Sequence, residues 1–306
     1  MEETKRYGLI GSEISGSRSP ELFRAAYDGR FPYDLLDGAE FLPLWKRFLE
    51  EYQAVNVTAP FKQDAFAQGL QLARDGYAGI SGPCFKIRAT NLVVKTPDGL
   101  MFHNSDFTGI ILSVAEACFP GVVDQCYGVY GERGHVKVHQ FLRENLEEHY
   151  GYKPQALVVG VGGAGRAAAV AAAEMGFATA LMNRTHEKAQ ALAAEFPEYG
   201  FIPVPMGDFK AAVQECDLVI YTLPGTIPAV EELEEAHFKG EDGPGKIILE
   251  ANYKTPAFSG PVREKLDAAG ARYVPGIRWL LYQALTGYGL MTGAPADIMA
   301  LEEAIR

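Results

Sequence analysis

The sequence predicts an α/β protein of two domains, and three observations support this fold class. The chain has 306 residues, more than one compact domain usually contains. Its second half alternates short apolar runs with helical patterns, which predicts a parallel sheet covered by helices on both faces. A glycine-rich turn joins the first of these runs to the first helix. We therefore expect a doubly wound domain in the second half and a separate α/β domain in the first.

The glycine-rich turn follows the apolar run 157–159 and precedes an alanine-rich helix that ends at Gly176. Gly160, Gly162 and Gly165 fit the pattern G-x-G-x-x-G. Glycine permits the positive φ of such a turn and the close approach of a pyrophosphate, and the helix N-terminus offers free N–H groups. The turn predicts a dinucleotide site, with a purely structural strand–helix turn as the alternative.

Apolar periodicity and turn residues predict the remaining elements. In the first half we expect strands at 7–11, 32–37 and 54–58, a hairpin with arms 86–95 and 100–103, and helices at 21–27, 41–52 and 107–118. In the second half we expect strands at 177–182, 218–223, 246–250 and 271–274, and helices at 136–150, 187–196, 209–215, 230–238 and 261–269. Residues 128–134 are expected to form a loop.

Two hydroxyls gather at the start of the first helix, where the sequence reads Ser17, Arg18, Ser19, Pro20. Pro20 suits the first helical position and Ser19 suits the N-cap. The segment is either a well-formed helix cap or an anion site, because hydroxyls and free N–H groups both favour a negative group.

Lys62 lies at the start of a helix, where the helix dipole disfavours a cation. Such a lysine suits proton transfer, although an isolated lysine is more often a solvated surface residue. Asp106 lies at the start of the helix 107–118. It is either a cap of that helix or the carboxylate partner of Lys62.

Charge and cysteine content exclude some classes of protein. The chain has 28 basic and 39 acidic residues and a formal net charge of −11, which argues against nucleic acid or an anionic membrane as a partner. No signal peptide or membrane-spanning run is expected. Four cysteines lack metal-binding spacing and are typical of reduced thiols in a cytoplasmic protein: Cys84, Cys118, Cys126 and Cys216. His135 and His139 lie four positions apart, but without a third ligand a surface helix is favoured over a metal site.

The end of the second strand of the doubly wound domain carries no acidic residue and reads Asn183, Arg184, Thr185. A site for NAD usually places a carboxylate there, on the ribose 2′-hydroxyl. A guanidinium instead suits the 2′-phosphate of NADP, and Lys188, one turn further on, adds positive charge. The sequence therefore predicts NADP, with a surface Arg–Lys pair as the alternative.

Together these segments resemble the shikimate dehydrogenase family, from Tyr7 to the C-terminus, apart from a block at about 119–153. The matching motifs are S-x-S-P at 17–20, N-V-T-x-P-x-K at 56–62, N-S-D at 104–106, G-x-G-G-A-x-R at 160–166 and N-R-T at 183–185. Asn91, Tyr253, Gln283 and Ala284 also have counterparts in the family.

The resemblance implies a reversible, NADP-linked reduction of 3-dehydroshikimate to shikimate in aromatic amino acid biosynthesis. Lys62 and Asp106 would then be the catalytic pair, with Lys62 giving a proton to the forming alkoxide. The residues implied to hold the substrate are Ser17, Ser19, Thr58, Asn91, Tyr253 and Gln283. Those implied to hold the cofactor are Gly160, Gly162, Gly163, Ala164, Gly165, Asn183, Arg184, Thr185 and Lys188.

The resemblance also implies where the domains lie. Residues 1–112 and 278–306 would form the substrate-binding and catalytic domain, which the C-terminal helical segments 282–287 and 296–305 would complete. Residues 113–277 would form the Rossmann-type dinucleotide-binding domain. Within it, the block 119–153 would be a lid, a contact in a homodimer, or decoration.

Several positions depart from the family pattern and leave the ring acid open: Gly16, Phe23, Arg24, Leu92, Glu250 (where aspartate is usual) and the segment Ile277, Arg278, Trp279. One alternative is therefore a dehydrogenase of quinate or another polyhydroxy ring acid that uses NAD or NADP. Another alternative, of a different class, is a non-catalytic sensor of dinucleotide or ring acid. The presence of both Lys62 and Asp106 favours an enzyme over a sensor.

Overall fold

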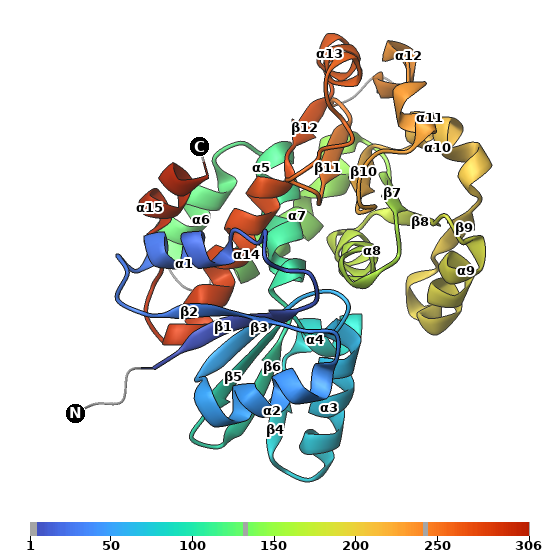
Figure 1. Cartoon of the computed structure of the whole chain (residues 1–306). Helices are drawn as coiled ribbons and strands as arrows, with labels where there is room; N and C mark the ends of the chain where they lie inside the picture. Colours follow the sequence, from blue (N-terminus) through green and yellow to red (C-terminus); the bar gives the residue numbers. More distant parts are fainter. Residues whose placement is uncertain (1–4, 131–133, 241–243, 306) are drawn as a thin grey trace. The chain divides into compact units, whose positions relative to one another are not determined.

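The computed structural model describes residues 5–130, 134–240 and 244–305, and Figure 1 shows the course of the chain. The chain divides into two compact units, Met1–Thr108 with Gln283–Arg306, and Gly109–Tyr282. Helices α5 (Ser105–Cys118) and α14 (Gly276–Thr292) each continue from one unit into the other. The boundaries expected from sequence, 112 and 278, fall inside these two helices.

The first unit contains a mixed six-stranded sheet in the order β2-β1-β3-β5-β6-β4. Its strands are β1 (Tyr7–Gly11), β2 (Tyr33–Asp37), β3 (Ala54–Val57), β4 (Ala78–Ile80), β5 (Leu92–Thr96) and β6 (Gly99–His103). β1 pairs in parallel with β2 and β3, whereas β5 pairs antiparallel with both β3 and β6. Because β3 and β5 are antiparallel, the end of β3 lies beside the start of β5, where Thr58 follows one strand and Asn91 precedes the other.

Helices α2 (Phe41–Glu51), α3 (Lys62–Arg74) and α4 (Gly82–Ile87) pack apolar side chains against this sheet. On α2, Phe41, Trp45 and Phe48 recur at helical spacing and are buried. They share one core with Val93 of β5 and Phe102 of β6. In Figure 1, α2 and α3 lie on the same face of the sheet. Because this core fixes the start of α3, it also fixes the position of Lys62.

The C-terminal segment completes the first unit. Helix α15 (Ile298–Ala304) packs on α1 (Ser19–Ala26), and the N–H of Asp297 donates to the carbonyl of Ala26 at 3.1 Å. Phe23 is fully buried, with ring centroids 4.7 Å from Tyr33 and 4.9 Å from Tyr288 of α14. The return of the C-terminal helix to the N-terminal unit, which the family resemblance implies, is therefore present.

The second unit contains a six-stranded sheet whose strand pairs are all parallel, in the order β12-β11-β10-β7-β8-β9. Its strands are β7 (Gln155–Val159), β8 (Ala178–Met182), β9 (Ile202–Val204), β10 (Leu218–Tyr221), β11 (Ile247–Glu250) and β12 (Arg272–Val274). The order reverses at β7, so the doubly wound prediction is confirmed. The carboxyl ends of β7 and β8 are the places where such a sheet binds ligands.

Helices and short 3-10 turns surround the second sheet. They are α6 (Val122–Tyr130), α7 (Gly134–Tyr150), α8 (Gly163–Met175), α9 (His186–Glu195), η2 (Pro197–Tyr199), η3 (Met206–Asp208), α10 (Phe209–Glu215), α11 (Pro228–Glu231), α12 (Glu235–Phe238) and α13 (Pro261–Ala268). The core on one side of the sheet joins Leu157, Val219 and Ile248 of three neighbouring strands to Phe209 and Phe238 of the helices.

Two short edge strands are absent from the sequence prediction, β4 and β9, each of three residues. β9 has Pro203 at its centre, and a proline within a run argues for an edge strand or no strand at all. The hairpin arm expected from residue 86 begins at Leu92 instead, because residues 82–87 form α4. The hydroxyl of Ser81 caps that helix by accepting from the N–H of Cys84 at 3.4 Å.

The region before the second sheet is more helical than expected. Helix α6 includes residues 128–130 of the expected loop, α7 begins at Gly134, and residues 131–133 lie outside the described residues. Helix α7 buries Val138, Leu142 and Leu146 at four-residue spacing, so one face is packed rather than solvated. The helix expected at 230–238 is two helices, because Glu234 starts α12 with a capping box to His237.

Candidate active site

Lys62 and Asp106 form a buried ion pair in the first unit. Lys62 is the first residue of α3 and Asp106 lies in the first turn of α5, and Nζ and Oδ2 are 2.5 Å apart. The two residues are 8% and 3% exposed. A buried pair carries a large desolvation cost and adds little net stability, so its presence in a cluster of polar side chains indicates chemistry. The helix cap is supplied by Asn104, whose Oδ1 accepts from the N–H of Phe107 at 3.3 Å.

Asn91 lies one residue before β5 and is held by Ser105. The N–H of Ser105 donates to Asn91 Oδ1 at 2.7 Å, and Asn91 Nδ2 donates to Ser105 Oγ at 3.1 Å. Its backbone also bridges two strands, since its carbonyl accepts from Val57 and its N–H donates to His103. Asn91 is therefore fixed in orientation beside the residue that precedes Asp106, although the sequence placed it inside the hairpin arm.

The serine turn before α1 does not have the cap geometry expected. The N-cap is Arg18, which makes no capping side-chain hydrogen bond, and Ser19 is the first helical residue. Ser17 Oγ accepts from the N–H of Ser19 at 3.2 Å and donates to Ser19 Oγ at 3.1 Å. Both hydroxyls are half-buried and close together, so the turn resembles an anion site more than a helix cap.

Tyr33 and Asn56 connect the serine turn to Asn91 and are missing from the residues selected by sequence. The hydroxyl of Tyr33 donates to Asn56 Oδ1 at 2.8 Å, and Asn56 Nδ2 donates to the carbonyl of Asn91 at 3.3 Å. Burial and the nearby Tyr288 hold the pKa of Tyr33 well above its usual value, although a hydrogen bond with Ser19 lowers it. Asn56 belongs to the motif N-V-T, so the sequence could have indicated it as a site residue. No motif contains Tyr33, and its neighbours in the sequence do not indicate that its hydroxyl makes a polar contact.

Thr58 and Gln283 complete the candidate residues of the first unit. Thr58 follows β3 and is half-buried, its N–H donates to the carbonyl of Ile10, and its carbonyl accepts from Phe61 immediately before Lys62. Gln283 is half-buried on α14, and it is the residue at which the C-terminal segment of the first unit begins. The first unit thus brings together the serine turn, Thr58, Asn91 and the ion pair through one set of neighbouring strand ends and helix starts.

The glycine loop of the second unit has the backbone that its motif requires. Gly160 has φ +95°, which favours glycine, and its N–H donates to the carbonyl of Met182 at 2.7 Å. A Cβ on Gly165 would collide with the carbonyl of Gly160, so only glycine lets α8 approach the strand end. A Cβ on Gly162 would meet no protein atom within 4 Å, so the space beside this residue is open. The side chain of Thr222 supports the loop by donating to the carbonyls of Val159 and Gly160 at 3.0 and 3.1 Å.

The segment after β8 lies next to this loop. Asn183 Oδ1 accepts from the N–H of Val161 at 3.3 Å, and its Nδ2 donates to the carbonyl of Thr185 at 2.9 Å. Arg184 and Lys188 are exposed, and neither makes a side-chain hydrogen bond or ion pair to the residues described. Gly163 and Ala164 open α8 at the loop. Open space at Gly162, a helix N-terminus and two cations fit a phosphorylated dinucleotide, which would be held by these groups.

Three of the departures from the family pattern, Phe23, Leu92 and Trp279, are buried apolar residues. Phe23 is fully buried in the aromatic cluster of the first unit, and Trp279 is buried in the second unit. Arg24 and Arg278 are exposed. Tyr253 is half-buried in the loop that follows β11, in the second unit.

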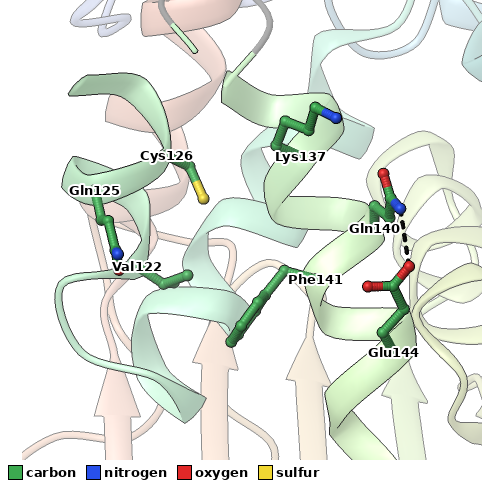
Figure 2. Close-up of a pocket in the computed structure, with 7 residues that line it drawn as sticks. All are labelled: Val122, Gln125, Cys126, Lys137, Gln140, Phe141 and Glu144. Carbon is green, nitrogen blue, oxygen red and sulfur yellow. Dashed lines mark hydrogen bonds between the residues drawn. The ribbon is translucent and has the colours of Figure 1, made fainter. Parts of the chain in front are cut away.

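A cavity of about 300 Å³ lies between α6 and α7, and its lining includes none of the candidate site residues. Figure 2 shows that its lining comes from the two helices of the block 119–153: Val122, Gln125, Cys126, Lys137, Gln140, Phe141 and Glu144. Gln140 Nε2 donates to Glu144 Oε1 at 2.8 Å. Burial raises the pKa of the Cys126 thiol, which makes it a weak nucleophile.

Among the residues that the structure describes, no group of three or more His, Cys, Asp or Glu side chains is arranged to hold a metal ion. His139 instead lies 3.1 Å from the carbonyl of Glu174 on α8. Within the described ranges, none of the helices has both the length and the apolar character needed to cross a membrane.

Comparison with known proteins connects this fold to one family. Residues 144–243 match the model of the family described as Shikimate / quinate 5-dehydrogenase. The chain is 28% identical to shikimate dehydrogenase (NADP(+)) of Natronomonas pharaonis, over 98% of each chain. It is 27% identical to the protein of the same name from Carboxydothermus hydrogenoformans, over 99% of this chain and 97% of that one. The crystal structure of Mycobacterium tuberculosis shikimate dehydrogenase superposes with a TM-score of 0.71 at 25% identity, covering 98% of each chain.

The parallel sheet and its glycine loop define the class: a two-domain α/β protein with a Rossmann-type dinucleotide-binding unit. Within that class, the matched segment and the relatives that align along the whole chain all point to one family. Over residues 144–243 the chain is similar to the shikimate / quinate 5-dehydrogenase family, and along its whole length it is similar to proteins named shikimate dehydrogenase (NADP(+)).

Proposed function

We propose that this protein is an NADP-dependent oxidoreductase that reversibly reduces 3-dehydroshikimate to shikimate in aromatic amino acid biosynthesis. The observation that carries the proposal is the buried Lys62–Asp106 pair, which lies in the same unit as hydroxyl and amide groups suited to a polyhydroxy acid. The relatives described above are named shikimate dehydrogenases of NADP, and the whole chain aligns with them.

In this proposal the first unit binds the ring acid. Ser17 and Ser19 receive its carboxylate, while Thr58, Asn91 and Gln283 hold ring hydroxyls, and Tyr253 of the second unit adds a contact. Together these groups fix the ring so that one carbonyl faces the reductant, which removes orientational entropy from the barrier. They also distinguish a hydroxylated ring from an apolar one, because an unpaired buried amide costs binding energy.

Reduced NADP supplies the hydride when it is bound. Hydride transfer to a ketone leaves negative charge on the oxygen, and the ammonium of Lys62 both stabilises that charge and donates a proton to it. Asp106, 2.5 Å from the ammonium, holds the lysine in place and keeps its charge compensated between turnovers. In the reverse direction Lys62 accepts the proton from the shikimate hydroxyl.

The second unit binds the dinucleotide in this proposal. The pyrophosphate lies over Gly160, Gly162, Gly163, Ala164 and Gly165, where the N-terminus of α8 favours an anion. The 2′-phosphate is bound by Arg184 and Lys188, with Asn183 and Thr185 shaping the turn between β8 and α9. A guanidinium can bind a phosphate through two parallel N–H bonds, so Arg184 is the main determinant of NADP over NAD.

Quinate is the second candidate substrate, since the family description names it together with shikimate. Phe23 and Trp279, which stand at positions that depart from the family pattern, are core side chains. A quinate dehydrogenase would use the same ion pair and the same serine turn.

A matrix of two substrates and two cofactors tests the proposal. Shikimate or quinate is combined with NADP⁺ or NAD⁺, and absorbance of the reduced nicotinamide is followed. The proposal expects the largest kcat/KM for shikimate with NADP⁺. A preference for quinate would transfer the assignment to the second candidate, and no turnover with any combination would favour a sensor.

We also propose a cytoplasmic location and a homodimer. Among the described residues all four cysteines are free and buried, which suits a reducing compartment. Light scattering coupled to gel filtration gives the mass of the assembly, and a monomer at micromolar concentration would contradict the dimer.

A further inference from the structure

The loop that follows β11 carries Tyr253 and has no helix or strand between Ala251 and Gly260. Its tip, residues 254–256, is exposed. A side chain on such a loop keeps one position only where hydrogen bonds or packing hold the loop. The groups that hold this loop therefore control where the phenol of Tyr253 lies.

Glu250, the last residue of β11, provides the main anchor and is fully buried. Its Oε1 accepts from the N–H of Ala257 at 2.5 Å. Its Oε2 accepts from the hydroxyl of Tyr273 on β12 at 2.8 Å and from the N–H of Phe258 at 3.4 Å. One carboxylate thus joins the beginning of the loop, its return and the neighbouring strand.

Two further contacts fix the segment on either side of Tyr253. Asn252 Oδ1 accepts from the N–H groups of Lys254 and Thr255 at 3.0 and 3.2 Å, which forms a tight side-chain turn. Behind the loop, a Cβ on Gly276 would lie 2.5 Å from the carbonyl oxygen of Ala251, so the start of α14 packs directly on the backbone. Tyr253 lies between these fixed points.

The structure assigns Glu250 as a positioning residue for Tyr253, acting through the loop 251–258 and not through contact with the substrate. The inference rests on the proposed function, in which Tyr253 contacts the ring acid. A carboxylate accepts from all three groups around it. A glutamine of the same size would direct its own N–H₂ either at a backbone N–H, which cannot accept, or at the hydroxyl of Tyr273, which would then have to accept instead of donating.

Burial raises the pKa of Glu250, and its hydrogen bonds with Ala257, Tyr273 and Phe258 lower it. The carboxylate form is therefore stabilised by the same contacts that hold the loop. Aspartate, the usual family residue here, is one methylene shorter and would lose reach toward either Ala257 or Tyr273.

The chain offers a matched control in Asp217, which makes a similar arrangement at the opposite ends of the strands of the same sheet. Its Oδ1 accepts from the hydroxyl of Tyr152 at 2.6 Å and its Oδ2 from the N–H of Gln155 at 2.8 Å. Asp217 directly precedes β10 and Gln155 begins β7, so these contacts lie at the amino ends of the strands. Asp217→Asn therefore disturbs a buried carboxylate without touching the loop of Tyr253.

The test is a double-mutant cycle of Glu250→Gln and Tyr253→Phe, with kcat/KM for shikimate and NADP⁺ as the readout. We expect Glu250→Gln alone to lower kcat/KM by about tenfold, because a displaced contact group loses orientation. In the Tyr253→Phe background the same change should matter by less than about twofold, because the two residues act as one unit. Asp217→Asn should lower the Tm while leaving kcat/KM within about twofold of the wild type.

An equal loss in both backgrounds, or an equal loss with Asp217→Asn, would overturn the inference. Hydrogen exchange over residues 251–258 gives a second readout that needs no turnover. Faster exchange in Glu250→Gln, but not in Asp217→Asn, supports the anchor, and unchanged exchange overturns it. A wild-type protein that turns over no ring acid would refute the proposed function instead, and exchange would still decide the role of Glu250. If Glu250→Gln does not fold, Glu250→Asp takes its place in both measurements.

Discussion

The polar side chains of the first unit are positioned by strand ends and helix starts rather than by one continuous motif. Lys62 begins α3, Asp106 begins α5, and Asn91 precedes β5. Helix and strand termini leave backbone groups available and hold side chains more rigidly than long loops do. This explains how residues 44 positions apart form a contact of 2.5 Å.

Replacing Lys62 tests the catalytic pair. Lys62→Ala should lower kcat by roughly 10²–10⁴, the usual contribution of a positioned acid or base. It should also destabilise the fold by about 3–5 kcal/mol, because Asp106 is then left as an uncompensated buried charge. Steady-state kinetics measure the loss in kcat, and urea unfolding measures the loss in unfolding free energy. Fluorescence titration with NADPH is the control for cofactor binding. An undiminished kcat would remove the lysine from the mechanism.

Replacing Arg184 tests cofactor choice. Its side chain is exposed and makes no ion pair with any residue described, so Arg184→Ala should leave Tm almost unchanged. Loss of a charge-assisted hydrogen bond to phosphate should weaken NADP⁺ by roughly ten- to a hundredfold and NAD⁺ much less. Dissociation constants for both cofactors provide the comparison. Equal losses for NADP⁺ and NAD⁺ would mean that Arg184 does not bind the 2′-phosphate.

At the scale of elements, the turn from β7 into α8 separates the structural use of glycine from its use in binding. An alanine at Gly165 would collide with the carbonyl of Gly160, whereas one at Gly162 meets no protein atom within 4 Å. We expect Gly165→Ala to lower the Tm, and Gly162→Ala to keep the Tm while weakening NADP⁺ through contact with the pyrophosphate. Thermal unfolding with and without NADP⁺ measures both variants. Unaltered NADP⁺ affinity in Gly162→Ala would place the pyrophosphate elsewhere.

Most long elements were predictable because they have strong apolar periodicity, and α10 and β1 match their expected bounds. Elements were missed where two signals competed. β9 was missed because it contains Pro203, which is unfavourable in a strand. Residues 82–87 were expected in a hairpin arm, but they form α4, which has Ser81 as its N-cap and Pro83 in its first turn. Whether such a short segment forms a helix or an edge strand depends on capping and on pairing with a neighbouring strand. These depend in turn on tertiary contacts, which the sequence does not show.

The candidate site was predictable to a different degree. Motifs indicated Lys62 and Asp106, whose pairing depends on the relation between α3 and α5. Tyr33 and Ser105 were not selected, because a tyrosine in a strand and a serine at a helix start are common in any protein. Only the fold reveals that Ser105 orients the side chain of Asn91 and that Tyr33 connects through Asn56 to the backbone of Asn91.

At the scale of the whole molecule, acid should destabilise both units through half-buried histidines. Burial lowers the pKa of His103 in the first unit, and burial together with Arg272 lowers the pKa of His149 in the second. A folded-state pKa below the unfolded value means that the unfolded chain binds more protons in that window. Stability from these groups is thus fully present above about pH 6.5 and is lost as the pH falls through their folded pKa values.

Urea unfolding in ordinary buffers between pH 7.5 and pH 5.5 measures how the free energy of unfolding depends on pH. His103→Gln and His149→Gln should each flatten the slope of unfolding free energy against pH, and the double variant should flatten it most. A slope unchanged in the double variant would assign the acid sensitivity to other groups.

The second unit is one uninterrupted stretch of chain, whereas the first is assembled from both ends of the sequence. The hydroxyl of Tyr288 donates to the carbonyl of Ser19, a residue made 269 positions earlier. At a translation speed of about 5–20 residues per second, the ribosome delivers the later partner roughly 13–54 s after the earlier one. During synthesis the second unit is therefore complete before the first unit has received its C-terminal helices. A chain released before those helices are made would contain the whole second unit and an incomplete first unit.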